Sequence, residues 1–392
     1  MQTDTPASPL LGGLSPAEFL DTYWQKKPLV VRDALPHFTS PLSPEELAGL
    51  ALEEGVASRL IMEKGGDYPW QLRSGPFDEE DFLALPETHW TLLVQEVDAL
   101  LPEVGALLNH FRFIPRWRID DVMVSYAPEH GSVGAHIDNY DVFLLQGLGH
   151  RRWEIGHAPV EDEQIKPDLD VRMLDHFEPD ETMVLGPGDM LYLPPRFAHY
   201  GVAEDDCMTY SIGFRAPSHR GLVGDYLSHI LSEIDTNARY SDPDLSPTDH
   251  PGAIRDEARE RVRSILRDTV ADDAAIDRWF GQYITSPERG RVPAEPDEPI
   301  TPEALQQALR DGAMLRRSPV VRVAYMAHDD GTATLFTGGD ATDLDAEMAF
   351  AAPLLADHNR LRAADFGDHL DRLAVVELLA ELVNDGVFEL ES

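Results

Sequence analysis

The chain has 392 residues, of which 71 are Asp or Glu and only 32 are Lys or Arg, so its formal net charge at pH 7 is −39. A chain of this length usually forms more than one domain, and a hydrophobic content of 43% is enough for buried cores. The single cysteine, Cys207, excludes an internal disulfide and a metal site built from several cysteines.

The excess of acidic residues indicates which classes of partner the protein can bind. A protein that binds nucleic acid is expected to carry a basic face, because neutralising phosphates supplies most of such affinity, so direct nucleic-acid binding is disfavoured. Excess acid suits a basic protein partner, and it also suits a halophilic source with a salty cytoplasm, where salt screens self-repulsion. We favour the halophilic explanation as a hypothesis. Nothing near Met1 resembles a signal peptide and no apolar run approaches the ~18 residues of a membrane helix, so we expect a cytoplasmic protein without a membrane segment.

The first part of the chain, to about residue 217, is rich in predicted strands and has short helices near its start. Ser43 is predicted to cap a helix that begins at Pro44, because Ser accepts from free amide groups and Pro fits the first helical position. The core strands are expected at residues 121–126, 142–145, 151–155, 182–185, 190–193 and 209–214.

Three residues in this part have the pattern of a metal site. Side chains alternate across a strand, so His136 and Asp138 project to the same face. A turn at residues 187–189 starts a short strand that the prolines at 194–195 end, and His199 lies just beyond it. Two histidines and one carboxylate can occupy one face of Fe(II) and leave the opposite positions open. A His-x-Asp tripeptide alone is common, but two such segments in an antiparallel barrel are much more specific, and they predict an iron oxygenase.

Four segments carry a resemblance to a known family. They are residues 19–29 (FLDTYWQKKPL), 117–121 (WRIDD), 136–143 (HIDNYDVF) and 210–217 (YSIGFRAP). These segments resemble the JmjC oxygenases, and most closely the bacterial ribosomal oxygenases that hydroxylate an arginine of a large-subunit ribosomal protein. The resemblance runs nearly end to end, although layout rather than motif carries its C-terminal part.

The resemblance implies a set of cofactors and a reaction. Fe(II) would be bound by His136, Asp138 and His199, and 2-oxoglutarate and O2 would be the cosubstrates. Oxidative decarboxylation of 2-oxoglutarate to succinate and CO2 then supplies an oxidant for an unactivated C–H bond. The protein contributes positioning, exclusion of water and tuning of the metal.

The far carboxylate of 2-oxoglutarate needs a fixed cation, which arginine supplies with paired donors. Arg151 shares its strand face with Trp153 and Ile155, so alternation predicts that it points into the barrel, whereas Arg152 points outward. By the same logic Ser125 can donate its hydroxyl to that carboxylate. Both residues match the family's cosubstrate-binding positions. The alternatives are a surface salt bridge for the arginine and an ordinary strand position for the serine.

Other polar residues near the motif are given no role. The histidines at 110, 130, 157, 176 and 219 show no ligand spacing relative to one another, so we expect them at the surface or in hydrogen bonds. Residues 139–141 follow the ligands in the family pattern. They could shape the substrate entrance or only stabilise the turn, and both interpretations stay open.

The middle of the chain changes its hydrophobic period. Apolar residues recur every four residues over 222–234, 254–266 and 276–284, which predicts three amphipathic helices. Such helices cannot bury much by themselves, so they should pack against a neighbour. In the resembled family this neighbour is a second subunit, and the resemblance therefore implies a homodimer, whereas the spacing implies only packing.

A proline-containing linker at residues 286–296 precedes the final part of the chain. Thr301 and Pro302 predict a helix start, Asp330 and Gly331 predict a hairpin turn, and two helices and a short strand at 387–390 follow. This layout resembles the winged helix that closes these oxygenases. From residue 301 to residue 392 there are seven arginines, no lysine and seventeen acidic residues, so the charge disfavours DNA binding.

These observations predict a mixed α/β chain in separate domains. Residues 1–217 are expected to form a JmjC double-stranded β-helix, which is a cupin-type barrel. Residues 218–293 are expected to form a helical dimerisation domain, and residues 294–392 a winged-helix-like domain.

The leading functional hypothesis is an Fe(II)- and 2-oxoglutarate-dependent hydroxylase that acts on an arginine β-carbon of a basic large-subunit ribosomal protein. An N-methyl-lysine demethylase is the runner-up, because the same iron chemistry could attack an N-methyl group. A cupin-type metalloenzyme without 2-oxoglutarate is a further alternative, against which Asp138 and Arg151 argue. A non-catalytic dimeric binding scaffold is the alternative from a different class, and the intact ligand set disfavours it.

Overall fold

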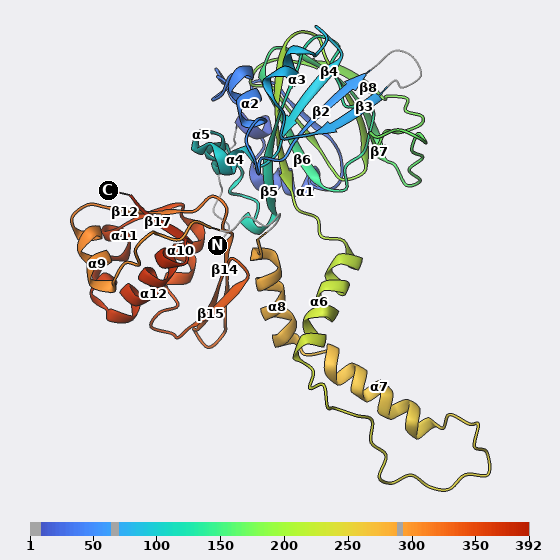
Figure 1. Ribbon diagram of the computed structural model, residues 1–392, viewed down its shortest axis with the longest axis vertical. Coiled ribbons are helices and arrows are strands. Elements are labelled where there is room, and N and C mark those ends of the chain that lie inside the picture. The colour runs from blue at the N-terminus through green and yellow to red at the C-terminus, as the bar shows by residue number, and fades with distance from the viewer. Residues whose placement is uncertain (1–8, 64–69, 288–292, 392) are drawn as a thin grey trace. The chain divides into compact units, whose positions relative to one another are not determined.

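The computed structural model describes residues 9–63, 70–287 and 293–391, and the chain divides into two compact units, Met1–Ala216 and Pro217–Ser392 (Figure 1). The predicted division into three domains, with borders after residues 217 and 293, stays a prediction. Residues 288–292 of the predicted linker lie outside the described residues. Among the described residues, no helix is long and apolar enough to cross a membrane.

Short helices open the first unit, and their N-termini are capped as the sequence predicts. Ser43 accepts a hydrogen bond from the backbone of Glu46, whose side chain accepts one from the backbone of Ser43, so the predicted helix does begin at Pro44. The same reciprocal cap joins Ser15 and Glu18. The α-helices of this unit are α1 (Pro16–Thr22), α2 (Pro44–Leu50), α3 (Glu79–Leu83), α4 (Val97–Leu100) and α5 (Pro102–Gly105).

Two antiparallel sheets form the barrel of the first unit. The larger sheet has the strand order β1-β9-β6-β11-β5-β4-β2-β3, and the smaller has the order β10-β7-β8. Their strands are β1 (Leu29–Val31), β2 (Ser58–Glu63), β3 (Trp70–Ser74), β4 (Trp90–Val94), β5 (Ile119–Ala127), β6 (Asp141–Leu148), β7 (Arg151–Pro159), β8 (Glu181–Leu185), β9 (Met190–Leu193), β10 (Phe197–Ala203) and β11 (Cys207–Phe214). All six predicted core strands are confirmed, and most are longer than predicted.

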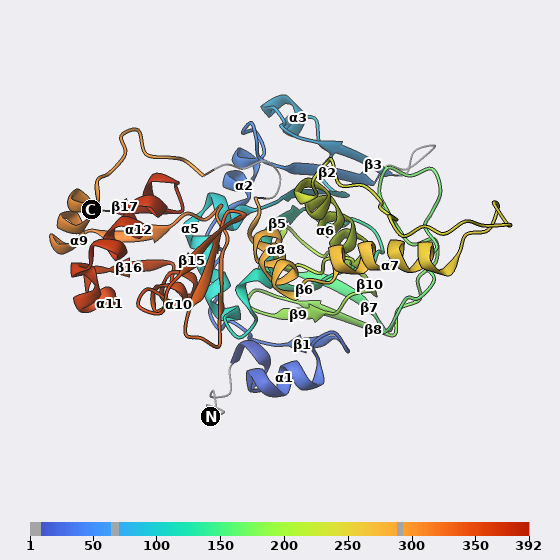
Figure 2. The same ribbon diagram turned by 90° about the horizontal axis from the view of Figure 1, so that it is seen from below.

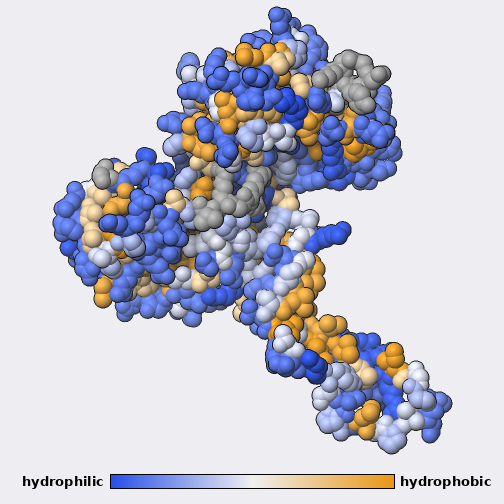
Figure 3. Space-filling view, in the orientation of Figure 1, coloured by the Kyte–Doolittle hydropathy of each residue, from blue (hydrophilic) through white to orange (hydrophobic). Residues whose placement is uncertain are grey.

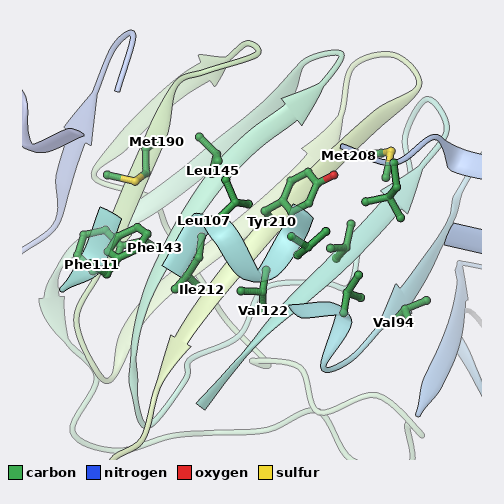
Figure 4. Close-up of a cluster of buried hydrophobic side chains, with 14 of the residues drawn as sticks. Val94, Leu107, Phe111, Val122, Phe143, Leu145, Met190, Met208, Tyr210 and Ile212 are labelled. Atoms are coloured by element: carbon green, nitrogen blue, oxygen red, sulfur yellow. The ribbon is translucent and has the colours of Figure 1, made fainter. Parts of the chain in front are cut away.

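Alternation along the strands separates two apolar clusters. On the outer face of the larger sheet, side chains such as Phe143, Leu145 and Tyr210 belong to a core that also holds Leu107 and Phe111 from the segment before β5 (Figure 4). On the inner face, a second cluster joins the two sheets across the barrel. It consists of Val142, Leu144, Leu191 and Leu193 from the larger sheet and Trp153, Ile155, Met183 and Leu185 from the smaller. The inner cluster fills one part of the barrel and leaves the polar side chains of β5, β7 and β11 in the other.

The second unit begins with the three predicted helices, α6 (His219–Glu233), α7 (Asp256–Val270) and α8 (Asp273–Thr285), so this prediction is confirmed. Figures 1 and 2 both show α6 beside α8. The indole of Trp279 on α8 donates a hydrogen bond to Asp225 on α6 at 2.8 Å. In contrast to the barrel strands, α6 and α7, both fully described, contain no buried residue.

The predicted C-terminal layout is also confirmed. A helix begins at Pro302 with Thr301 as its cap, and a hairpin turns at Gly331, whose φ of 85° suits glycine. The structure adds β12, β15, β16 and a third helix after the hairpin, so that α10, α11 and α12 stand where the predicted layout had two helices. The elements are α9 (Pro302–Arg310), β12 (Met314–Arg317), β13 (Val323–Ala327), β14 (Ala333–Thr337), β15 (Asp340–Leu344), α10 (Ala351–Asp357), β16 (Arg360–Arg362), α11 (Ala363–Phe366), α12 (Leu373–Asn384) and β17 (Phe388–Glu391).

Candidate active site

The three predicted metal ligands lie together in the barrel. His136 and His199 exchange two backbone hydrogen bonds of 3.0 Å, which places their side chains next to each other. The Oδ2 atom of Asp138 lies 4.0 Å from Nε2 of His136 and 3.6 Å from Nε2 of His199. One potential ligand atom from each residue falls within 4.8 Å of the other two. Small shifts would bring all three within bonding distance of one ion.

Backbone carbonyls orient both imidazole rings. Nδ1 of His136 lies 2.9 Å from the carbonyl oxygen of Gly134, and Nδ1 of His199 lies 3.0 Å from that of Phe197. A ring that donates from Nδ1 presents the lone pair of Nε2, the form in which histidine binds a metal. Burial lowers the pKa of His199 to about 4, and this also favours the neutral ring. The donor set therefore fits a divalent transition metal.

The segment that carries His136 and Asp138 is held from several sides. Gly134 has a φ of 85°, and a Cβ there would meet the side chain of Met173 at 2.3 Å. The backbone amide of Leu174 donates to the carbonyl of Ala135 at 2.8 Å, and the amide of Arg196 donates to the carbonyl of Asp138 at 2.6 Å. Preorganised ligands of this kind do not have to be ordered when the metal binds.

Tyr140, which the sequence left unassigned, lies beside the metal cluster. Although the residue is 40% exposed, its pKa is raised by desolvation of the hydroxyl, then by the charges of Asp138 and Asp121, by a hydrogen bond to Asp138, and by the charge of Asp120. Alternation was the available signal, since residues 136, 138 and 140 share a side of the chain.

Arg151 and Ser125 point into the barrel, as alternation predicts. Their exposed fractions are only 3% and 6%, whereas Arg152 lies outside in ion pairs with Glu154 and Glu204. Within the described part of the chain, Nε and Nη2 of Arg151 are buried without a hydrogen-bond partner. Among the described residues, the hydroxyl of Ser125 makes a long contact of 3.5 Å with the carbonyl of Thr209. Unpaired donors around a buried cation fit a carboxylate ligand.

Gln146 and Thr209 complete this polar end of the barrel, and sequence reasoning missed both. Thr209 pairs in register with Ser125 on one side and Gln146 on the other. Its hydroxyl donates to Oε1 of Gln146 at 3.1 Å, while Nε2 of Gln146 donates to the carbonyl of Leu148 at 2.8 Å. A glutamine at the end of the apolar run 142–145 was the signal that could have indicated this buried network.

Comparisons with known proteins identify the family. A JmjC domain model matches residues 106–222, and a ROXA-like winged helix model matches residues 267–389. The chain is 37% identical over 374 residues to the ribosomal protein uL16 3-hydroxylase of Escherichia coli (strain K12), which covers 95% of this chain and 97% of the relative. The chain belongs to the ribosomal oxygenase family.

Other ribosomal oxygenases are similar over most of their length. The probable ribosomal oxygenase of Haemophilus influenzae is 40% identical over 328 residues, covering 80% of this chain and 79% of the relative. The structure of YcfD, a ribosomal oxygenase from Escherichia coli, in complex with cobalt and 2-oxoglutarate is 35% identical. It has a TM-score of 0.83 and covers 96% of this chain and 98% of that one. A cupin-type JmjC barrel followed by helices and a winged helix is therefore the fold of this ribosomal oxygenase.

Proposed function

We propose that the protein is an Fe(II)- and 2-oxoglutarate-dependent hydroxylase of an arginine side chain in a large-subunit ribosomal protein. One observation carries this proposal. A His-Asp-His cluster and a buried arginine with free donors occupy the same barrel, in a chain that is 37% identical to a ribosomal protein uL16 3-hydroxylase. The arginine target and its β-carbon come from the family resemblance.

His136, Asp138 and His199 would hold the iron. Three protein ligands on one face leave positions for a bidentate keto acid and for O2. When bound, iron with 2-oxoglutarate and O2 supplies the oxidation that hydroxylates a C–H bond. The carbonyls of Gly134 and Phe197 keep the two imidazoles in the tautomer that binds metal.

Arg151 and Ser125 would bind the far carboxylate of 2-oxoglutarate. Arg151 can offer two donors from Nε and Nη2, and Ser125 can exchange its long contact with Thr209 for a shorter bond to the carboxylate. The inner apolar cluster around Ile155 and Leu144 limits water in the rest of the barrel.

The exposed apolar face of α6 and α7 supports the expected homodimer. Figure 3 shows apolar side chains gathered along these helices. Val223, Leu227 and Leu231 of α6 are 58%, 43% and 71% exposed, and Ile265 and Leu266 of α7 are 49% and 60% exposed. A contiguous apolar surface of this kind marks an interaction site in a protein that is otherwise strongly charged. A second copy of the chain is the proposed occupant.

A cytoplasmic location and a halophilic source remain part of the proposal. A net charge of −39 destabilises the folded chain through self-repulsion in dilute buffer, and molar salt screens it. We therefore expect the melting temperature to rise between dilute buffer and molar salt. An unchanged or lower melting temperature in molar salt would contradict the halophilic explanation.

The hydroxylase proposal is tested first by ligand-dependent stability. Mn(II) together with 2-oxoglutarate should raise the melting temperature, because both bind the folded state. Mn(II) should also stabilise the protein alone, through His136, Asp138 and His199. Absence of any protection by the pair would contradict the proposal and support a non-catalytic scaffold. Protection without succinate formation in the presence of Fe(II), O2 and large-subunit ribosomal proteins would also contradict it.

A further inference from the structure

Trp153 lies between the two ends of the candidate active site. It is the middle residue of three inward-facing positions on β7, between Arg151 and Ile155. On the neighbouring strand β10, Ala203 pairs with Arg151, Gly201 with Trp153 and His199 with Ile155. The tryptophan therefore lies one inward-facing position from the buried cation, and its cross-strand partner Gly201 lies one such position from a metal ligand.

The indole ring is fixed in this place. Its exposed fraction is 6%, its centroid is 6.0 Å from that of the His199 ring, and the guanidinium carbon of Arg151 is 5.8 Å from it. Gly201 leaves room for the ring, since a Cβ there would meet Cζ3 of Trp153 at 2.6 Å. Nε1 is on the opposite edge of an indole from Cζ3. The edge that carries the N–H is therefore turned away from this contact with β10.

This indole N–H is an unpaired donor. Nε1 of Trp153 is buried and has no hydrogen-bond partner in the described part of the chain. An indole nitrogen can only donate, and burying a donor without an acceptor is unfavourable because the donor loses its hydrogen bond to water. Two other indoles of the protein are bonded, that of Trp90 to the carbonyl of Pro86 at 2.8 Å and that of Trp279 to Asp225 at 2.8 Å.

Trp153 and Arg151 together present three unpaired donors inside one barrel. These are Nε1 of the indole and Nε and Nη2 of the guanidinium, and the two side chains are in contact with each other. Within the described residues, the nearby hydroxyl of Thr209 donates its hydrogen bond to Oε1 of Gln146. Three donors without acceptors require a ligand that is rich in acceptor atoms, and a dicarboxylate carries acceptors at both ends.

We propose that Trp153 is a further cosubstrate-binding residue, whose indole N–H donates a hydrogen bond to an oxygen of 2-oxoglutarate. This inference rests on the proposed function, because it assigns the dicarboxylate to the same part of the barrel as Arg151. It gives the tryptophan a role beyond filling the barrel. The N–H would hold the cosubstrate between the metal cluster and Arg151.

Calorimetric titration of 2-oxoglutarate into the Zn(II)-loaded protein tests the proposal without turnover. Trp153→Phe keeps an aromatic ring and removes the N–H, so the dissociation constant for 2-oxoglutarate should rise about tenfold while Zn(II) affinity is unchanged. Trp90→Phe removes a bonded indole elsewhere and should change neither constant. Equal 2-oxoglutarate affinity in Trp153→Phe and wild type would overturn the proposal.

A second measurement does not depend on the folding of the variant. In ¹H–¹⁵N spectra of the wild-type protein, the Trp153 indole signal is identified by its strong broadening when paramagnetic Mn(II) replaces Zn(II). It should move downfield when 2-oxoglutarate saturates the Zn(II) protein, as a newly bonded N–H does. A signal that stays in place under saturation would overturn the proposal. If wild type binds Zn(II) but no 2-oxoglutarate, the proposed function itself fails and the inference fails with it.

Discussion

The barrel interior and the α6–α7 helices differ in which of their side chains lack a partner. In the described part of the barrel, apolar residues such as Leu144 and Ile155 are buried by the chain itself, and the buried groups without a hydrogen-bond partner include polar donors of Arg151 and Trp153. In α6 and α7 no residue is buried, and the exposed groups that lack a neighbour are apolar, such as Leu231 at 71% exposure.

The difference indicates the chemistry of what each region binds. Buried donors without partners favour a small, acceptor-rich ligand, because such a ligand offsets the desolvation of those donors. An exposed apolar helix face instead selects a large apolar surface, which removes its side chains from water. We therefore expect the stability of the barrel to depend on ligand concentration, and the association of the helices to depend on protein concentration.

Loss of a metal ligand should have the largest effect on the barrel. His199→Ala removes a buried ligand, so hydroxylation should fall by well over a hundredfold, more than the 10–100-fold cost of losing a group that only orients a ligand. His157→Ala is the matched control, because His157 is exposed on β7 and pairs with Glu181. Activity assays and Mn(II) titration would check both variants. Normal activity in His199→Ala would contradict the site assignment.

Two adjacent arginines offer the next sharpest test. Arg151→Ala should weaken 2-oxoglutarate binding about a hundredfold, since two charge-assisted hydrogen bonds are lost, while metal binding is retained. Arg152→Ala removes the outward neighbour, which pairs with Glu154 and Glu204, and should change the affinity by less than about twofold. Calorimetry of both variants measures the difference. Similar affinities for the two would show that Arg151 does not bind the cosubstrate.

A charge placed on the exposed apolar face of α6 should weaken self-association of the protein. Leu231→Asp on α6 should weaken self-association at least about tenfold, because it loses apolar burial and places a carboxylate in both halves of a symmetric interface. Light scattering across a range of protein concentrations detects the change. Leu83→Asp on α3, where the leucine is 84% exposed, serves as the control. A wild-type protein that is monomeric at all concentrations would refute the dimer.

Replacing the carboxyl of Asp98 in the first unit should give the smallest effect, a pH-dependent change in the free energy of unfolding. Burial raises the pKa of Asp98 to about 7 from 3.8, with the amide of Val122 opposing the rise and the charges of Asp121 and Glu96 adding to it. Because the pKa is higher in the folded state, stability is lost as pH rises from about 3.8 to about 7, and the loss levels off above the folded pKa. Asp98→Asn should therefore gain on the order of 2 kcal/mol relative to wild type between pH 5 and pH 8.

Denaturant unfolding at the two pH values measures this gain. The opposite pH trend expected from the lowered pKa of His199 is present in both proteins and cancels in the comparison. An equal difference between Asp98→Asn and wild type at pH 5 and pH 8 would contradict the assignment of a neutral buried carboxyl.

The sequence predicted those parts of the fold that depend on local periodicity. Alternation placed Arg151 inside and Arg152 outside, and a four-residue period located α6, α7 and α8. The grouping of His136, Asp138 and His199 was predicted from chemistry and spacing, because two histidines and a carboxylate suit a metal ion, and the structure places the three side chains together. The resemblance then supplied the cosubstrate and the substrate class.

What the sequence did not predict depends on tertiary contacts. The buried link between Thr209 and Gln146 arises only when β11 lies between β5 and β6. That the indole N–H of Trp153 has no acceptor among the described residues depends on the positions of all its neighbours in the fold. The position of its ring also requires Gly201 on another strand. Such features cannot be predicted from local periodicity, because they depend on which hydrogen-bond partners lie near a side chain in the folded protein.

The most direct test of the central claim is mass spectrometry of large-subunit ribosomal proteins incubated with the enzyme, Fe(II), 2-oxoglutarate and isotopically heavy O2. His199→Ala serves as the inactive control. The account predicts that one heavy oxygen atom is gained on an arginine by wild type and not by the variant. Loss of a methyl group from a lysine, or succinate formation with no modified arginine, would contradict it.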